Sequence, residues 1–154
     1  MVLTSSKLVD THAHICDPVF DGDRTEVLQR AASAGVGAVI AVGENVSDAH
    51  KNIELATVHP VLRPAAGLYP TILDRNQAAA MCSFIRKERS KLYAVGEVGL
   101  DFWVVKEEAD KEIQRDIFKG FISLSQELDL PLNVHSRSAG RQSNPIARRA
   151  PNIE

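Results

Sequence analysis

The chain has 154 residues, of which 44% are hydrophobic and 25% charged, so it falls among ordinary globular domains and is long enough to bury one hydrophobic core. Its formal net charge of −2 excludes a globally basic, polyanion-binding surface, so any contact with nucleic acid has to be local. The two cysteines, Cys16 and Cys82, belong to no C-x-x-C pair, and we expect free thiols rather than a disulfide framework.

The start of the chain shows no secretory signal. Residues 1–7 lack the apolar core and cleavage site of a signal peptide, and no stretch of the sequence has the length of a membrane span. We therefore expect no membrane partner and a cytoplasmic protein, with the nucleus as the alternative.

The first predicted strand covers residues 8–14 and ends in two histidines spaced by one residue. Because strand side chains alternate with a period of two, Asp10, His12 and His14 should project from the same face. Two neutral imidazoles that converge there suit one divalent metal ion. An isolated His-x-His pair also fits two surface residues of an edge strand, so the interpretation depends on polar residues later in the chain.

Helices and strands alternate along the rest of the chain. Asp23 and Glu26 resemble a helix capping box, and the apolar stripe that follows stops at Gly35. Ser47 is placed to cap the next helix. The predicted strands after the first cover residues 36–43, 61–68, 92–97 and 132–135, and the predicted helices cover residues 23–34, 47–59, 78–89 and 109–128.

This alternation predicts an α/β fold with about five parallel strands, right-handed crossovers and four helices on the outside. The longest predicted helix carries an apolar stripe that includes Ile113, Ile117 and Phe121. The polar candidates for chemistry all fall at the carboxyl ends of strands. Both barrels and open α/β sheets place their sites at that edge.

Four residues from three predicted strands form the candidate metal site: His12, His14, Glu97 and His135. A carboxylate can bridge two ions, so Glu97 could join the first two histidines to the third. The nitrogen and oxygen donors suit Zn, Mn or Mg, and the absence of cysteine ligands argues against a closed structural zinc site. Two such ions would lower the pKa of a bound water and would hold both the attacking and the leaving oxygen of a displacement at phosphorus.

Each of these residues also has a purely structural interpretation. Glu97 could mark the polar end of a strand, and His135 could be a hydrogen-bonded loop histidine. His50 and His59 fit surface positions, and we assign them no role. The chain has no phosphate-binding P-loop, and Gly35 with Gly37 makes only a weak dinucleotide fingerprint because the pair precedes a strand.

Four motifs occur in order along the chain: LVDTHAH at 8–14, GLYP at 67–70, GEVGLD at 96–101 and LPLNVHSR at 130–137. Together they resemble the motifs of the TatD family of metal-dependent hydrolases and deoxyribonucleases. Residues 133–141 are similar to the animal TatD domain-containing branch, and the resemblance covers residues 8–141.

The resemblance implies a TIM-barrel fold and hydrolysis of phosphodiester bonds in DNA, or of another phosphoester, with a metal-activated water as nucleophile. It implies two divalent ions, one held by His12 and His14 and the second by His135, with Glu97 bridging them. Asp101 and Arg137 match motif positions near the site, and we count them with Glu97 as candidate catalytic residues. An arginine there can hold a phosphate oxygen.

The chain also departs from the family pattern. A complete barrel of this kind has roughly 250 residues and eight strands, so we expect residues 1–141 to form an N-terminal part of a barrel and residues 142–154 an irregular tail. Pro145 and Pro151 oppose a helix in that tail. The later histidine and aspartate ligands of the family have no counterpart here. We expect the first and fifth strands to be unpaired edges that favour self-association.

Three functions stay open at this point. The first is a TatD-like metal-dependent deoxyribonuclease. The second is a catalytically inactive partial barrel that retains only part of the metal site. The third is a metal hydrolase of another bond, because similar His-x-His barrels cleave amides and lactones.

Overall fold

The computed structural model describes residues 8–143. These residues contain one sheet of five parallel strands in the order β1-β2-β3-β4-β5, so each strand pairs with its neighbours in the sequence. The strands are β1 (Leu8–Ala13), β2 (Val36–Ala41), β3 (Leu62–Ala66), β4 (Ala94–Asp101) and β5 (Leu132–Arg137). The helices are α1 (Arg24–Ser33), α2 (Val46–Val58), α3 (Arg75–Glu88) and α4 (Glu108–Leu128), with short 3-10 helices η1 (Pro18–Phe20) and η2 (Arg89–Lys91).

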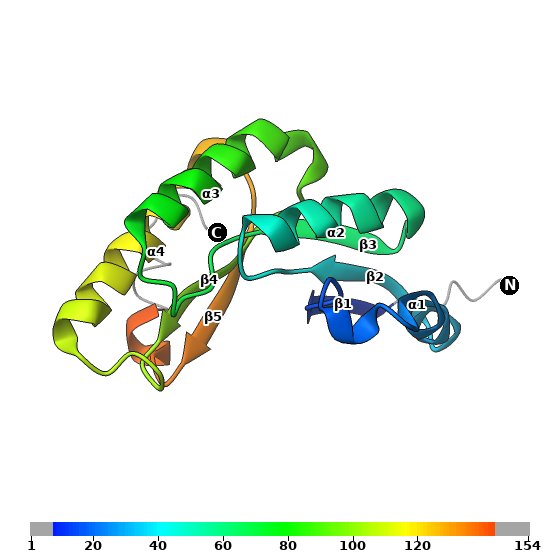
Figure 1. Cartoon of the computed structure of the whole chain (residues 1–154), viewed down its shortest axis with the longest axis horizontal. Helices are drawn as coiled ribbons and strands as arrows, with labels where there is room; N and C mark the ends of the chain where they lie inside the picture. Colours follow the sequence, from blue (N-terminus) through cyan, green and yellow to red (C-terminus); the bar gives the residue numbers. More distant parts are fainter. Residues whose placement is uncertain (1–7, 144–154) are drawn as a thin grey trace, which may run out of the picture.

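The sheet curves into an arch with the helices on its convex side (Figure 1). The α2 and α3 helices cover the top of the arch in this view, and α4 lies beside β4 and β5. The predicted α/β fold is confirmed, because the sheet has the strand order and curvature of the first part of a βα barrel. No helix in the described part of the chain combines the length and apolar character that a membrane span requires.

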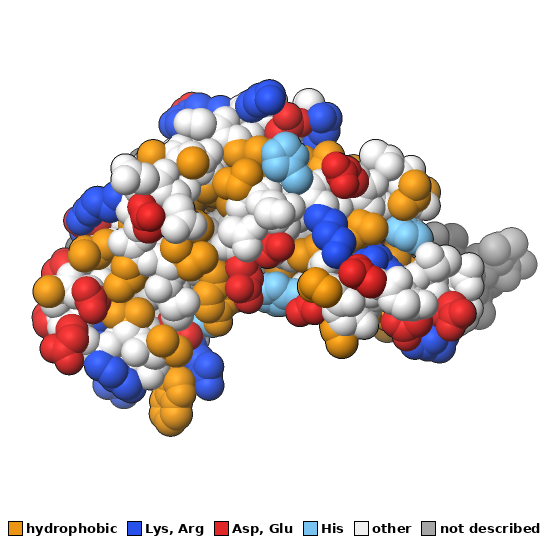
Figure 2. Space-filling model, viewed as in Figure 1, with side chains coloured by type: hydrophobic (Ala, Val, Ile, Leu, Met, Phe, Trp, Pro, Cys, Tyr) orange, Lys and Arg blue, Asp and Glu red, His pale blue; other side chains and the backbone are white. Residues whose placement is uncertain are grey.

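The main hydrophobic core lies between the strands and the outer helices. Its largest fully buried side chains come from α3 and α4 and include Met81, Ile85, Phe118 and Phe121. Burying each of these side chains stabilises the fold by about 1.5–3 kcal/mol. Because this core occupies the convex side, the concave side is left for polar groups, and acidic and histidine side chains gather in its hollow (Figure 2).

The strands differ in burial across the sheet. All eight residues of β4 are buried, whereas β1 and β5 form the two ends of the strand order and expose apolar side chains. Leu8 is 64% exposed, Val9 55% and Val134 38%. The predicted unpaired edges are therefore present in the described residues.

Two predicted helix starts need correction. Asn45, not Ser47, is the N-cap of α2, and its side chain accepts a hydrogen bond from the N–H of Asp48. Ser47 already lies in the first turn. Asp23 is the N-cap of α1, but it caps with its backbone carbonyl, which accepts from the N–H of Val27, and its side chain makes no capping bond.

The fourth and fifth strands differ in length from the prediction. The β4 strand continues four residues past Glu97 to Asp101, because residues 98–101 pair with β5. The β5 strand likewise continues to Arg137. In the tail predicted to be irregular, Gln142 and Ser143 donate their backbone N–H groups to the carbonyl of Ala139 in a helical turn. Residues 144–154 lie outside the described part.

Candidate metal centre

The two predicted histidine ligands at the start of the chain lie where β1 ends. His12 is in the strand, and His14 follows its last residue, Ala13. The pairing of β1 with β2 shifts register between Asp10 and Ala13. Asp10, expected beside the two histidines, uses its Oδ1 to accept a hydrogen bond from the backbone N–H of His12 at 3.0 Å. The side chains of His12 and His14 are 38% and 34% exposed, so both rings are reachable from solvent.

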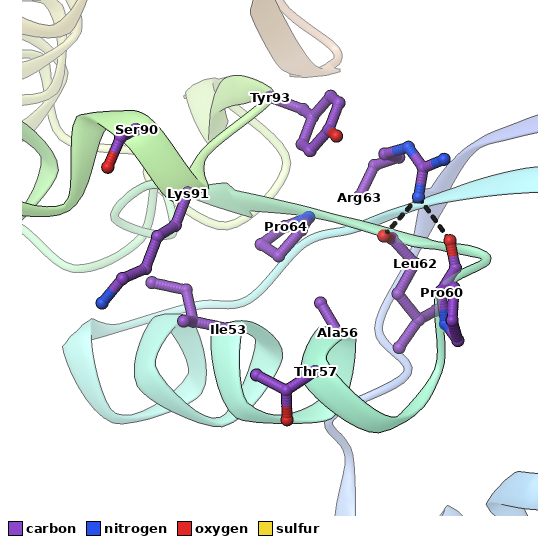
Figure 3. A pocket seen from close by; sticks show the side chains of 10 residues that line it. All are labelled: Ile53, Ala56, Thr57, Pro60, Leu62, Arg63, Pro64, Ser90, Lys91 and Tyr93. Atoms are coloured by element: carbon purple, nitrogen blue, oxygen red, sulfur yellow. Dashed lines mark hydrogen bonds between the residues drawn. The ribbon is translucent and has the colours of Figure 1, made fainter.

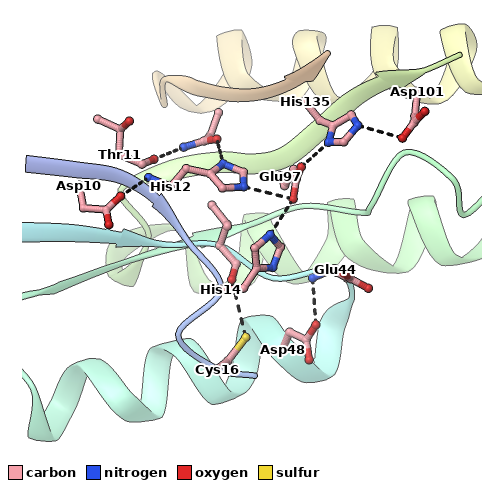
Figure 4. A network of polar contacts seen from close by, with 12 residues as sticks. Asp10, Thr11, His12, His14, Cys16, Glu44, Asp48, Glu97, Asp101 and His135 are labelled. Carbon is pink, nitrogen blue, oxygen red and sulfur yellow. Dashed lines mark hydrogen bonds and ion pairs between the residues drawn. The ribbon is translucent and has the colours of Figure 1, made fainter. Parts of the chain in front are cut away.

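Glu97 joins these histidines to the opposite side of the sheet (Figure 4). Its Oε2 lies 3.4 Å from Nε2 of His12 and 3.1 Å from Nε2 of His14. Its Oε1 lies 2.5 Å from Nδ1 of His135, which comes from β5. The structure thus brings the four predicted ligands together around one carboxylate that is only 3% exposed.

The hydrogen bonds of Asn133 define the protonation of the His12 ring. The Nδ2 of Asn133 donates to the carbonyl oxygen of Thr11 at 2.5 Å, and a carbonyl can only accept. The Oδ1 of Asn133 therefore faces Nδ1 of His12 at 2.8 Å, and that nitrogen must be the donor. When the ring is neutral, the Nε2 of His12 therefore presents a lone pair to the Glu97 carboxylate. Two such groups repel each other unless a cation lies between them.

The geometry of this group fits a metal ion. The ligand atoms of His12, His14 and Glu97 all lie within 4.8 Å of one another. Two ligands of a tetrahedral ion with bonds of about 2.1 Å stand about 3.4 Å apart, which agrees with the distances around Glu97 Oε2. That oxygen is buried and has no hydrogen-bond partner among residues 8–143. These three residues could therefore hold one divalent ion.

Asp101 extends the network from His135 to the next loop. Its Oδ2 lies 3.1 Å from Nε2 of His135, and its Oδ1 accepts from the backbone N–H groups of Trp103 and Val104, both at 2.9 Å. Among the described residues, the ion pairs of Glu97 and Asp101 are formed only with histidines. Buried carboxylates without a lysine or arginine partner favour a bound cation.

Two supporting residues were missed by the sequence analysis. Asn133 precedes His135 by two positions, so strand periodicity placed it on the same face, but nothing local indicated its contact with β1. Gln114 is a buried polar residue on α4 whose Oε1 accepts from the N–H of Asp101 at 3.0 Å. Its Nε2 donates to the carbonyl of Pro70 at 2.7 Å. Gln114 therefore fixes the end of β4 against the loop after β3.

Tyr69 and Arg137 lie at the edge of the cluster. The Tyr69 ring is 5.3 Å from the His135 ring. Burial raises the pKa of Tyr69, and the negative charge of Glu97 raises it further, whereas Arg137 acts in the opposite direction. The Arg137 guanidinium packs 5.5 Å from the centre of the Trp103 ring instead of binding a carboxylate. Its positive charge thus stands at the rim of the site and not in its centre.

A separate pocket lies at the start of β3, away from the carboxyl ends of the strands (Figure 3). It has a volume of about 380 Å³ and is bordered by α2 and η2. The guanidinium of Arg63 in this pocket donates to the carbonyls of Pro60 and Leu62. Among the described residues that line it, none is a histidine, cysteine or carboxylate, so it lacks the groups of a catalytic site.

Parallel strands under outer helices, with two histidines and a buried glutamate at their carboxyl ends, match the layout of βα barrels that hold a metal ion at that edge. Residues 9–153 match the family model described as TatD related DNase. The chain therefore belongs to the TatD family.

Three relatives show the extent of this similarity. The chain is 38% identical over 149 residues to human deoxyribonuclease TATDN3, covering 87% of this chain and 53% of that protein. It is 36% identical over 156 residues to mouse TATDN3, covering 92% and 52%. The crystal structure of YjjV from Escherichia coli, a TatD homologue, has a TM-score of 0.82 and 30% identity, covering 93% of this chain and 56% of that one. The chain thus spans about half the length of the curated relatives it matches.

Proposed function

We propose that the chain carries a metal-dependent phosphodiester-hydrolysing site of the deoxyribonuclease type. The observation that carries this proposal is the position of the Glu97 carboxylate. One oxygen faces the Nε2 atoms of His12 and His14 without a hydrogen bond, and the other faces His135. The names of the relatives support it, because human TATDN3 is called a deoxyribonuclease and YjjV a metal-dependent hydrolase.

In this proposal His12, His14 and Glu97 would hold one divalent ion, and His135 with Glu97 would contribute to holding a second. The donor set suits Zn, Mn or Mg. When bound, such ions polarise phosphoryl oxygens and lower the pKa of a coordinated water.

The chain's own residues orient these groups and bind the substrate. Asn133 holds the His12 ring with its Nε2 lone pair directed at the centre. Asp101 is a positioning residue, because it accepts from His135 and from two backbone N–H groups of the following loop. Arg137 supplies a positive charge at the rim, where a phosphate oxygen of DNA can accept hydrogen bonds from its guanidinium.

A cleavage assay tests this proposal. We expect the purified chain to release nucleotides from a single-stranded oligonucleotide with added Mn, Mg or Zn, and to stop in EDTA. His12→Ala should reduce the rate at least about 100-fold, because a lost metal ligand removes the Lewis acid. His59→Ala is the matched control, since His59 lies outside the cluster and should keep the wild-type rate. Cleavage that persists both in EDTA and in His12→Ala contradicts the proposal.

One observation favours a second candidate, metal binding without turnover. The ligand atoms of His12, His14 and Glu97 lie within 4.8 Å of one another. Among the described residues, these three side chains provide only part of the coordination sphere of a metal ion. Measuring metal content and cleavage on the same preparation separates the two candidates. Stoichiometric metal with no release of nucleotides from any oligonucleotide would support the second.

A further inference from the structure

Trp103 lies in the loop that follows β4 and is the only tryptophan of the chain. It is 59% exposed, and its neighbour Val104 is 54% exposed. A single exposed apolar side chain is ordinary on a protein surface and carries no inference by itself. The surroundings of Trp103 are what distinguish it.

Two cations lie over the indole ring. The guanidinium carbon of Arg137 is 5.5 Å from the ring centre, and the Nζ of Lys106 is 5.1 Å from it. Lys106 is also held by a 3.3 Å hydrogen bond to the carbonyl of Phe102. Among the described residues, neither Arg137 nor Lys106 has a carboxylate partner, so both positive charges are available to an anion. An exposed aromatic ring in contact with two cations that lack a carboxylate partner matches a ligand that alternates flat rings with phosphates.

The same loop is connected directly to the candidate metal centre. One oxygen of Asp101 accepts from the backbone N–H of Trp103, and the other faces His135. In the β4–β5 pairing Asp101 lies opposite Arg137, and the N–H of Phe102 donates to the Arg137 carbonyl at 2.9 Å. Trp103 and its cations are therefore held at the rim of the site by backbone bonds.

We propose that Trp103 is a stacking platform for an unpaired nucleobase, with the adjoining phosphates bound by Arg137 and Lys106. This inference rests on the proposed function, because it assigns Trp103 to binding the nucleic acid on which that site would act. A duplex keeps its bases stacked on each other and presents no free face except at its ends. The platform thus favours single strands over duplexes of the same sequence.

Because Trp103 is the only indole, its fluorescence reports directly on stacking. The titration is done in EDTA, so that no cleavage occurs, with a six-nucleotide oligodeoxyadenylate. The matched ligand is an abasic oligomer with the same number of phosphates. We expect the adenylate to quench Trp103 and to bind at least about tenfold more tightly than the abasic oligomer, as base–aromatic stacking requires. A duplex of the same length should bind more weakly than the single strand.

Variants are measured by polarisation of a labelled oligonucleotide. Trp103→Ala should weaken binding of the adenylate at least about tenfold, and Trp103→Phe should retain most of the affinity because a ring remains. Val104→Ala, at the exposed neighbouring position, should bind like the wild type. The side chain of Trp103 contributes little buried surface, so these variants should fold.

The role of the flanking cations is tested by salt. Lys106→Gln should reduce the slope of log affinity against log salt concentration by about 0.7, the value for one lost phosphate contact on a single strand. Lys87→Gln, at an exposed position on α3, should leave the slope unchanged.

Equal affinity for adenylate and abasic oligomers, or wild-type affinity in Trp103→Ala, overturns the inference. These outcomes are distinct from failure of the proposed function. Base-dependent quenching by a chain that never cleaves DNA supports the platform and contradicts hydrolysis.

Discussion

At the scale of single residues, the centre depends on how each imidazole is oriented before any ion arrives. Asn133 illustrates this, because it bridges the Thr11 carbonyl and the His12 ring across two strands that are far apart in the sequence. A histidine ligand whose second nitrogen is held in this way keeps one tautomer and one ring orientation. The amide thus acts on metal binding without touching the ion.

We therefore predict that Asn133→Ala weakens binding of a divalent metal about 10–100-fold, the usual effect of losing such a supporting hydrogen bond. The measurement is a competition titration against a chromophoric chelator. Asn76→Ala, at an exposed position on α3, is the matched control and should bind metal like the wild type.

A conservative variant separates orientation from general damage at this position. Asn133→Asp keeps an oxygen that can accept from Nδ1 of His12 but loses the donor to the Thr11 carbonyl, so it should recover part of the affinity that alanine loses. If the aspartate and alanine variants bind metal equally poorly while both fold, the orienting role of Asn133 is wrong.

At the scale of elements, the approach of β4 to β5 determines whether Glu97 and His135 meet. Gly99 sits in that contact with φ +150°, and a Cβ added there would lie 2.0 Å from the carbonyl oxygen of His135. A side chain is excluded both by the backbone conformation and by the neighbouring strand.

Gly99→Ala should accordingly destabilise the fold by roughly 3 kcal/mol, from the strained φ together with overpacking. Urea unfolding followed by circular dichroism measures this. Gly120→Ala on α4 provides the contrast, because nothing lies within 4 Å of its added Cβ. That variant should gain stability of up to about 1 kcal/mol from helix propensity. Equal stability of the two variants would be incompatible with a tight β4–β5 contact.

The start of α3 gives a prediction about pH. The hydrogen bond from the Gln77 side chain, with further bonds from the N–H groups of Gln77 and Asn76, lowers the pKa of Asp74 below its ordinary value. A carboxylate whose pKa is lowered on folding stabilises the protein above its unfolded pKa of about 3.9 and loses that contribution as the pH falls through the lower folded pKa.

The comparison is with Asp74→Asn, which retains a capping oxygen but does not titrate. We expect the wild type to be more stable than this variant at pH 6 and the difference to shrink as the pH is lowered below about 4. Unfolding midpoints in urea at a series of pH values provide the measurement. A difference that stays constant over this range would show that the charge of Asp74 contributes nothing to the cap.

Local patterns predicted the elements well, and the stripe on α4 correctly placed Phe121 in the core, but they did not reveal every residue of a buried face. The apolar stripe through Ile113 and Ile117 suggested the inner face of α4, yet the buried face includes Gln114 and Ser125. Both polar residues are satisfied, since Ser125 donates to the carbonyl of Leu130 at 2.7 Å. Hydrophobicity alone cannot identify a buried position whose polar group has a partner elsewhere in the chain.

The same limit applies at the site. The alternation of strands and helices made it predictable that His12, Glu97 and His135 end at one edge, because parallel strands share that edge. Their connection by Asn133, and the exposed platform at Trp103, were not predictable. These features depend on contacts between residues separated by many positions, and they leave no periodicity in the local sequence.

At the scale of the whole molecule, the sheet ends in two strands with free edges. Within residues 8–143, β1 and β5 each pair with only one neighbouring strand, and they carry the exposed side chains of Val9 and Val134, 55% and 38% exposed. Edges of this kind pair readily with another strand when no charge or proline blocks them. We propose that copies of the chain associate through these two strands.

The last prediction tests this association. Sedimentation equilibrium of the chain should give an average mass that rises above the monomer mass with increasing concentration. Placing a lysine on each edge strand, in Val9→Lys with Val134→Lys, should return the mass to that of the monomer, because a charge on an edge opposes strand pairing. Val58→Lys is the control. Val58 is 68% exposed but ends α2 on the convex side, so its variant should associate like the wild type. A wild-type chain that stays monomeric at every concentration would rule out the association. A Val58→Lys variant that dissociates as much as the double lysine variant would show that the contact does not depend on these two strands.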